Sequence, residues 1–282
     1  MAVTAADVKK LRDATGVGPA ECKKVLTETD GDFDKAVKIL KEKGLAAAAK
    51  RADRATNQGR VTVKVKDNAG VLVELATETD FVARNPEFIA LGETITDKIL
   101  NENYAETDER LTAMVKDLAT SIRENMSLKR VKLIKASAGQ HLASYIHGDG
   151  AIGVIVLVSA DKPEVFAKEE AQAFIFSLAM HAAAFNPLAV SAADVDPAIL
   201  KEQENLFRKQ MEQDEKLKGK PSNVLEGILK GKLNKYLADI CFLDQNYIKN
   251  DKITVKQALA DEGKGLGAVF KIEQYCIFKV GA

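Results

Sequence analysis

Residues 60–76 read RVTVKVKDNAGVLVELA, and this stretch decides how the core of the chain folds. Val61, Val63 and Val65 alternate with polar residues, which is the period-two pattern of a strand with one buried face. Residues 67–70 form a polar, turn-prone run, and residues 71–76 return to aliphatic side chains. The stretch therefore predicts a β-hairpin.

The same plan recurs farther along the chain. After the hairpin, Pro86 can open an amphipathic helix, and a second helix is expected over residues 107–125. Then follow a strand at residues 129–135, a hairpin of residues 141–147 and 151–159 around Gly148-Asp149-Gly150, and a helix from about 163 to 185. We interpret this recurrence as an internal duplication, in which two α+β halves pack together.

The N-terminal part reads as three short helices. Thr4 and Asp7 have the spacing of a capping box, and Gly16 ends the first helix. Gly44 is expected to end the third helix, with residues 45–56 as a helical linker. A bundle this small buries little apolar surface, so we interpret it as a docking module attached to a larger body.

The C-terminal third combines a charged segment with a return to the core. Residues 197–217 and 222–238 have helical patterns with sparse apolar positions, which predicts a protruding antiparallel helical hairpin. Residues 254–262 read as a short helix, and residues 268–280 as a terminal strand that rejoins one of the sheets.

These patterns predict the α+β class with antiparallel sheets. The expected parts are an N-terminal helical domain with its linker (1–56), a first core half (57–140), a second core half (141–196), the helical hairpin (197–240) and a return to the core (241–282).

The composition limits the function. Lys plus Arg number 41 and Asp plus Glu also number 41, so no net positive charge favours direct binding to nucleic acid. No apolar run resembles a signal peptide or approaches the length of a membrane span. The sequence therefore predicts a cytoplasmic protein that binds neither nucleic acid nor membrane.

No pattern indicates a catalytic or metal site. Cys22, Cys241 and Cys276 lack C-x-x-C spacing and are expected as buried thiols, and the three histidines lack the i, i+4 spacing of a metal pair. Residues 227–233 resemble a phosphate loop only loosely and are expected in a helix, while the glycines of residues 263–267 are expected in a turn. We predict no catalytic residue, no metal and no cofactor.

One segment stands out against this background. Residues 74–85 run from a strand into a polar stretch that places Phe81 between Asp80 and Arg84. In one interpretation the ring packs into its own domain, and the residues alone favour this, since most loop aromatics do so. In the other, the ring is a wedge for a crevice in a partner, and the carboxylate disturbs charges there.

The sequence resembles the elongation factor Ts family. Two long stretches carry the resemblance, namely residues 11–26 (LRDATGVGPAECKKVL) and Thr79-Asp80-Phe81-Val82 with the strand before it. Shorter matches lie at residues 144–148, 180–187, 245–247 and 278–281, so the resemblance covers nearly the whole chain.

The resemblance implies a fold and a function. The fold would comprise a ubiquitin-associated-like helical domain, a two-part core and a coiled-coil hairpin. The partner would be elongation factor Tu, from which the chain would speed GDP release. Thr79, Asp80, Phe81 and Val82 would dislocate the magnesium ion in the partner's nucleotide site. His147 lies before Gly148 at a hairpin turn, and we assign it a secondary partner contact.

The chain departs from the family pattern in two places. Pro19-Ala20 stand where the family often has two methionines, which are adaptable contact residues, so a weaker contact from the N-terminal domain is expected. The sequence stops soon after the terminal strand, and we expect no further C-terminal module.

Two rival functions remain open. The N-terminal bundle could make the chain a non-enzymatic adaptor for a ubiquitin-like or other protein. A nucleic-acid-binding translation factor would instead show binding to RNA that depends strongly on salt. A charged helical hairpin can dimerise, bind the partner or do neither, so the sequence leaves a homodimer through this hairpin open.

Overall fold

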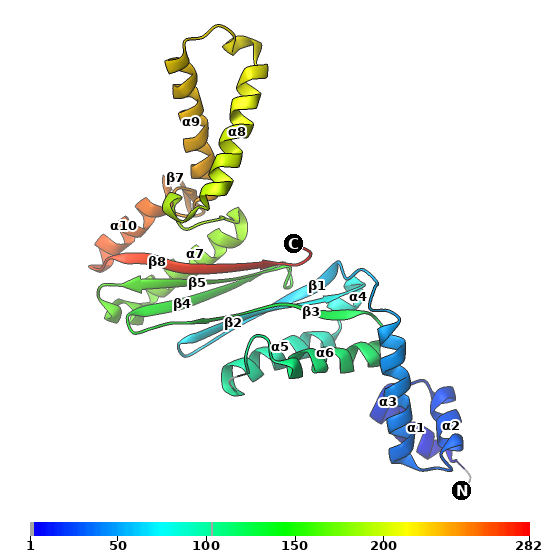
Figure 1. Ribbon diagram of the computed structural model, residues 1–282. Helices are drawn as coiled ribbons and strands as arrows, with labels where there is room; N and C mark the ends of the chain where they lie inside the picture. Colours follow the sequence, from blue (N-terminus) through cyan, green and yellow to red (C-terminus); the bar gives the residue numbers. More distant parts are fainter. Residues whose placement is uncertain (1–2, 103) are drawn as a thin grey trace.

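Two three-stranded antiparallel sheets form the centre of the molecule (Figure 1). The computed structural model describes residues 3–102 and 104–282, so residues 1 and 2 of the predicted N-terminal unit lie outside it. The first sheet has the order β1-β2-β3 and the second the order β4-β5-β8. Their strands are β1 (Gln58–Lys66), β2 (Ala69–Thr77), β3 (Met126–Lys135), β4 (Gln140–His147), β5 (Ile152–Ala160) and β8 (Phe270–Lys279).

The two sheets pack face to face and helices cover their outer faces (Figure 1). On β2, Val71 and Val73 belong to the cluster beneath the helices α5 (Pro86–Glu102) and α6 (Glu109–Ile122), whereas Leu72 belongs to the cluster between the sheets. Helices α7 (Glu169–Phe185) and α10 (Val255–Leu266) cover the second sheet. The alternation in the sequence thus explains a four-layer core, and the α+β class is confirmed.

The two halves repeat one plan closely. The central strands β2 and β5 have nine residues each, and each is followed by a short helical turn, α4 (Asp80–Ala83) or η1 (Pro163–Ala167), and then a helix of 17 residues. A register shift interrupts β2 between Glu74 and Leu75, and β5 at the matching place between Leu157 and Val158. The predicted duplication is therefore visible in spacing and in register.

The strand predicted at residues 129–135 is present and extends over residues 126–135. The strand is β3, which pairs with β2 and completes the first sheet, as β8 completes the second. Each copy therefore runs hairpin, helices, strand, because the third strand pairs with the free edge of its own hairpin.

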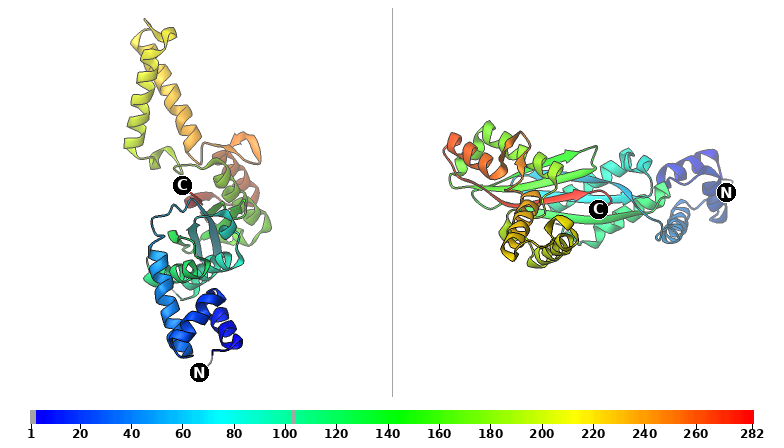
Figure 2. Two further views of the ribbon diagram at one scale, coloured as in Figure 1. Left: turned by 90° about the vertical axis from the view of Figure 1, so that its right-hand side faces the viewer. Right: turned by 90° about the horizontal axis from the view of Figure 1, so that it is seen from above.

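The three N-terminal helices are α1 (Ala5–Thr15), α2 (Pro19–Glu28) and α3 (Phe33–Ala49), and they confirm the predicted bundle. The Thr4–Asp7 capping box is present, and Gly16 ends α1 with φ of 66°. Gly44 does not end α3, contrary to prediction. A Cβ at Gly44 would collide with Thr120 on α6, so the missing side chain lets the bundle approach the core there (Figures 1 and 2).

The helical hairpin protrudes from the second half, as predicted (Figures 1 and 2). It consists of α8 (Pro197–Gln213), η3 (Glu215–Leu217) and α9 (Ser222–Ile240). At its base, Leu188 N–H donates to Ile240 O at 2.8 Å and Phe242 N–H donates to Ala189 O at 2.9 Å. Both ends of the hairpin therefore leave the core at one place.

Several predicted boundaries change. Helix α6 ends at Ile122 because Arg123 adopts φ of 67°, and α7 begins only at Glu169, after η1. Gly263 and Gly265 lie inside α10, so the expected turn is limited to Gly267, which has φ of 75°. The remaining short elements are η2 (Ala192–Asp194), β6 (Asn246–Tyr247) and β7 (Asn250–Thr254).

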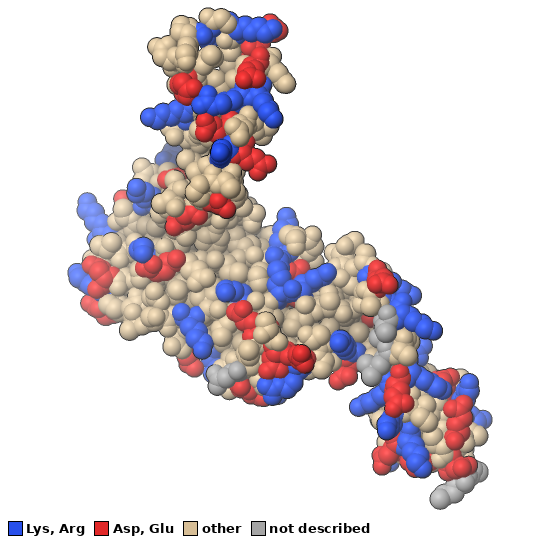
Figure 3. All heavy atoms as spheres, viewed as in Figure 1, with Lys and Arg blue, Asp and Glu red and all other residues tan. Residues whose placement is uncertain are grey.

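Charges of both signs are interspersed over the face seen in Figure 3, in keeping with the balanced composition. Within residues 3–102 and 104–282, every helix is too short or too polar to span a bilayer.

Candidate functional site

The segment that was expected to be a polar loop contains the single helical turn α4 at the end of β2. Thr79 is its N-cap, with extended φ and ψ of −121° and 154°, and its Oγ1 accepts from Val82 N–H at 3.4 Å. Threonine suits this position because its hydroxyl satisfies an amide that a helix start leaves free. The turn presents its residues in fixed directions.

Phe81 and Val82 have opposite surroundings. Phe81 is 82% exposed, whereas Val82 is 8% exposed and joins the core cluster of Leu75 and Phe88. The interpretation in which the Phe81 ring packs into its own domain is therefore wrong. Val82 fills the available place in the core, and the helical turn directs its neighbour outward.

The second half of the fold has a counterpart of this position. In η1, Val165 is buried like Val82, and the residue before it is the exposed Glu164. Glu164 is thus the counterpart of Phe81. Since a polar residue meets the needs of the fold there, packing does not explain an aromatic ring at Phe81. An exposed aromatic side chain on a rigid turn is typical of a contact with another protein.

Asp80 lies beside the ring and is paired with a cation. Its carboxylate is 3.2 Å from the Arg84 guanidinium, one helical turn away, and both side chains face solvent. Exposed pairs of this kind contribute little to stability, about 0.5 kcal/mol. Asp80 can therefore exchange Arg84 for another cation at little cost.

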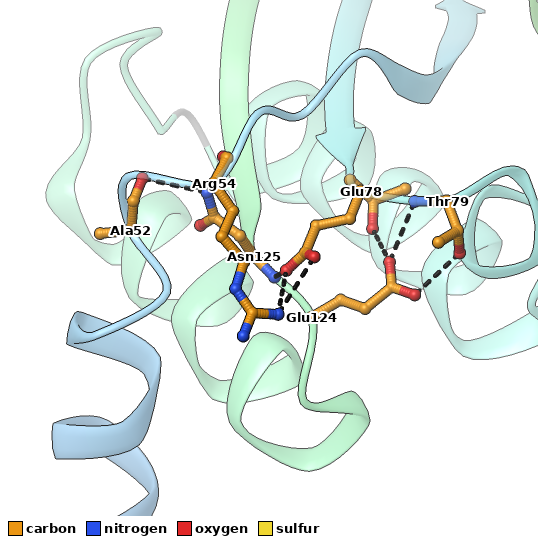
Figure 4. A network of polar contacts seen from close by, with 7 residues as sticks. Ala52, Arg54, Glu78, Thr79, Glu124 and Asn125 are labelled. Atoms are coloured by element: carbon orange, nitrogen blue, oxygen red, sulfur yellow. Dashed lines mark hydrogen bonds and ion pairs between the residues drawn. The ribbon is translucent and has the colours of Figure 1, made fainter.

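A carboxylate beneath the turn binds its N-cap (Figure 4). Glu124, between α6 and β3, accepts from Thr79 N–H at 3.1 Å and from Thr79 Oγ1 at 2.8 Å. It also accepts from the Thr77 hydroxyl at 2.9 Å, and Thr77 is fully buried at the end of β2. The turn is thereby tied to a fixed point of the sheet.

A second carboxylate joins the same region to the linker from the N-terminal bundle (Figure 4). Glu78 accepts from Asn125 N–H at 2.6 Å and from the Arg54 guanidinium at 3.2 Å. The hydrogen bond from Asn125 N–H, followed by that from Arg54, lowers the pKa of the Glu78 carboxyl. The Asn125 side chain donates to Ala52 O at 3.0 Å and to Arg54 O at 2.7 Å.

The three histidines stay apart. His147 is exposed at the end of β4 and lies within hydrogen-bonding distance of the Tyr145 hydroxyl, at 3.0 Å. His141 stacks on Phe166, and burial lowers its pKa. His181 is fully buried, where it hydrogen-bonds with the Gln245 side chain at 3.0 Å. In the part of the chain that the structure describes, no three His, Cys, Asp or Glu residues gather as a metal site would require.

The cysteines follow the prediction in part. Cys22 and Cys241 are buried, whereas Cys276 is only partly buried, and all three are free thiols. Burial raises the pKa of the Cys241 and Cys276 thiols, which makes them poor nucleophiles.

Comparison with known proteins identifies the family. Residues 78–282 match the family model described as Elongation factor TS. Elongation factor Ts of Treponema denticola is 46% identical, over 100% of this chain and 99% of its own. The proteins of the same name from Treponema pallidum and Borrelia recurrentis are 42% and 38% identical, again over the whole of this chain and 99% and 100% of theirs. The α4 turn, Glu124 and Asn125 all lie within the matched residues, and this chain belongs to the elongation factor Ts family of translation elongation factors.

Proposed function

We propose that this chain is a guanine-nucleotide exchange factor that binds elongation factor Tu in its GDP form and promotes GDP release. The observation that carries the proposal is the 82% exposure of Phe81 on a braced turn, at a position where the other half of the fold has Glu164. An apolar ring held in this way can enter a crevice of a partner without first being ordered, so the entropic cost of binding is small.

The four residues of the predicted site have two different tasks in this proposal. Phe81 and Asp80 face outward and make the contact, while Thr79 and Val82 hold the turn from below. The ring displaces elements of the partner, and the Asp80 carboxylate competes for cations near the nucleotide.

The target of this disturbance is the magnesium and phosphate site of the GTPase. A GTPase holds its nucleotide through backbone amides, a lysine and a magnesium ion that bridges protein and phosphates. Displacing any of these weakens the phosphate contacts together. By linkage, a factor that lowers nucleotide affinity is itself bound more weakly by the nucleotide-bound partner, to the same degree. Incoming GTP therefore releases the factor, and no covalent chemistry is needed.

The test is release of a fluorescent GDP analogue from elongation factor Tu. The intact chain should accelerate release, and Phe81→Ala and Asp80→Ala should slow it without altering the fold. Val269→Ala is the matched control, because Val269 is another exposed apolar residue, at 69%, in the second half. If the intact chain fails to accelerate release, the exchange function is excluded.

The adaptor function has one supporting feature. A groove of about 550 Å³ lies between α1 and α2 and is lined by apolar residues and by Lys9, Arg12 and Lys23. Pro19 and Ala20 also line it, which places the departure from the family pattern at a potential contact. Binding of elongation factor Tu that survives Phe81→Ala but requires this groove, with no change in GDP release, would favour the adaptor.

A further inference from the structure

Helix α4 cannot hold its own shape. It has four residues, and a single isolated helical turn is unstable in water because its first hydrogen bond fixes several backbone dihedrals at once. Val82 and Ala83 anchor one side of the turn in the core. The direction of Phe81 also depends on what fixes the other side, where the chain leaves β2.

The Glu124 carboxylate occupies that side. Its three hydrogen bonds join the buried Thr77 hydroxyl to both donors of Thr79, the N-cap. Hydrogen bonds to a charged acceptor are about twice as strong as neutral ones. Glu124 therefore connects the rigid end of β2 to the first residue of the turn, and it does so from a segment far away in the sequence.

Comparison with the second half shows which of these hydrogen bonds both halves share and which occur in the first half alone. There, Val269 N–H donates to Asp161 at 2.6 Å, just as Asn125 N–H donates to Glu78 at 2.6 Å in the first half. This bond belongs to the shared plan of the two halves.

A side chain also links the matching segments of the second half, where Lys162 Nζ donates to Gly267 O at 2.7 Å, but no side chain caps the start of η1. The matching positions in the second half carry Ala160, Lys162 and Ala268 in place of Thr77, Thr79 and Glu124, and η1 starts without a side-chain cap. The half that carries Glu164 thus folds without this brace. The brace occurs only in the half that presents Phe81.

We propose that Glu124 is a positioning residue for partner binding, which acts through Thr79 to hold the α4 turn with Phe81 directed outward. This inference rests on the proposed exchange function. Without the carboxylate the turn samples other conformations, so the fraction of chains ready to bind falls, and apparent affinity falls by the same factor.

The exchange assay tests this directly. Glu124→Ala should raise the concentration of the chain that gives half-maximal GDP release by about five- to tenfold and leave the maximal rate intact. Glu124→Gln, which keeps the shape and one acceptor oxygen, should recover most of the loss. In a chain that carries both Asp80→Ala and Phe81→Ala, Glu124→Ala should add nothing further, because the turn then has neither contact side chain to present.

A second measurement needs no partner. Amide hydrogen exchange by NMR should be about tenfold faster at Ala83 and Arg84 in Glu124→Ala, since their amides bond within the turn, while Val269 in the second half is unchanged. If the amide hydrogens of Ala83 and Arg84 exchange at the wild-type rate in Glu124→Ala, the inference is overturned. This holds even if the chain does not promote GDP release. A wild-type half-maximal concentration in Glu124→Ala, or a further loss when Glu124→Ala is added to Asp80→Ala with Phe81→Ala, would also overturn it while leaving the exchange function intact.

Discussion

Arg130 on β3 donates to the carboxylate of Glu74 on β2 at 2.6 Å, and this carboxylate is only 3% exposed. The Arg130 guanidinium also donates to Lys279 O at 2.9 Å and lies 4.6 Å from the centre of the Phe278 ring. An ion pair whose carboxylate is buried and whose guanidinium is partly exposed thus joins two strands of the first sheet to the last strand of the second.

Breaking this pair from one side should be costly. In Arg130→Gln, the Glu74 carboxylate stays buried without its cation, and we expect a loss of about 2–3 kcal/mol in the free energy of unfolding, moderated because Arg130 is partly exposed. Leu157 and Gln274 are the counterparts of Glu74 and Arg130 in the second half. The double variant Glu74→Leu, Arg130→Gln copies them and should recover most of the loss in urea unfolding. If the double variant has a lower free energy of unfolding than Glu74→Leu alone and Arg130→Gln alone, this prediction is wrong.

Phe81 and Val82 should separate binding from stability. Val82→Ala leaves a small cavity in the core and should lower the free energy of unfolding by about 2 kcal/mol. Phe81→Ala should change it by less than about 0.5 kcal/mol, because the ring makes few contacts within the chain. Thermal and urea unfolding measure both, and a large destabilisation by Phe81→Ala would show that the ring is packed in solution.

His181 should make stability fall in mild acid. Burial lowers its pKa in the folded chain below the value of roughly 6.5 for a free imidazole. Below that pH, the unfolded chain binds a proton that the folded chain does not, so the free energy of unfolding decreases as pH drops from about 7 towards 5. His181→Gln should make the free energy of unfolding depend less on pH. The dependence that is left should come from His141, because burial lowers its pKa as well. Urea unfolding across this pH range is the measurement, and an equally steep slope in the variant would contradict it.

Gly44 should fix the position of the N-terminal bundle. Alanine favours a helix interior over glycine by about 1 kcal/mol, so Gly44→Ala would normally stabilise α3. Here its methyl group meets Thr120, and we expect the contact between α3 and α6 to loosen, with faster proteolysis in the linker after α3. Thr120→Ala in the same chain should restore protection. Unchanged proteolysis in Gly44→Ala would mean that α6 shifts to accept the methyl group.

The sequence predicts the fold well where the signals are local. Alternation in residues 60–76 gives β1 and β2, and the capping residues Thr4 and Gly16 give both ends of α1. It fails where tertiary contacts override a local signal. Gly44 looks like a helix stop but is a contact with α6. Arg123 ends α6 in a left-handed conformation, which the sequence does not predict because the residue there is not a glycine.

The candidate site divides in the same way. The family resemblance identifies Thr79 to Val82, but the residues alone favour a buried Phe81, because the sequence does not show that Val82 already fills the core. Glu124, Asn125 and Arg54 carry no signal at all. Residues 124 and 125 were expected in a helix, and their partners at Thr79 and Glu78 lie 45 and 47 positions away.

The backbone hydrogen bonds at the base of the helical hairpin allow its length to vary without a change in the core. Since the chain enters at Leu188 and leaves at Phe242 through neighbouring backbone bonds, the hairpin is a side branch whose length the sheets do not constrain. Adding one residue to α8 and one to α9 would lengthen the hairpin by roughly 1.5 Å. The distance from the core at which the tip meets another molecule is therefore adjustable by insertion, while Phe81 on α4, in the first half of the core, stays where it is.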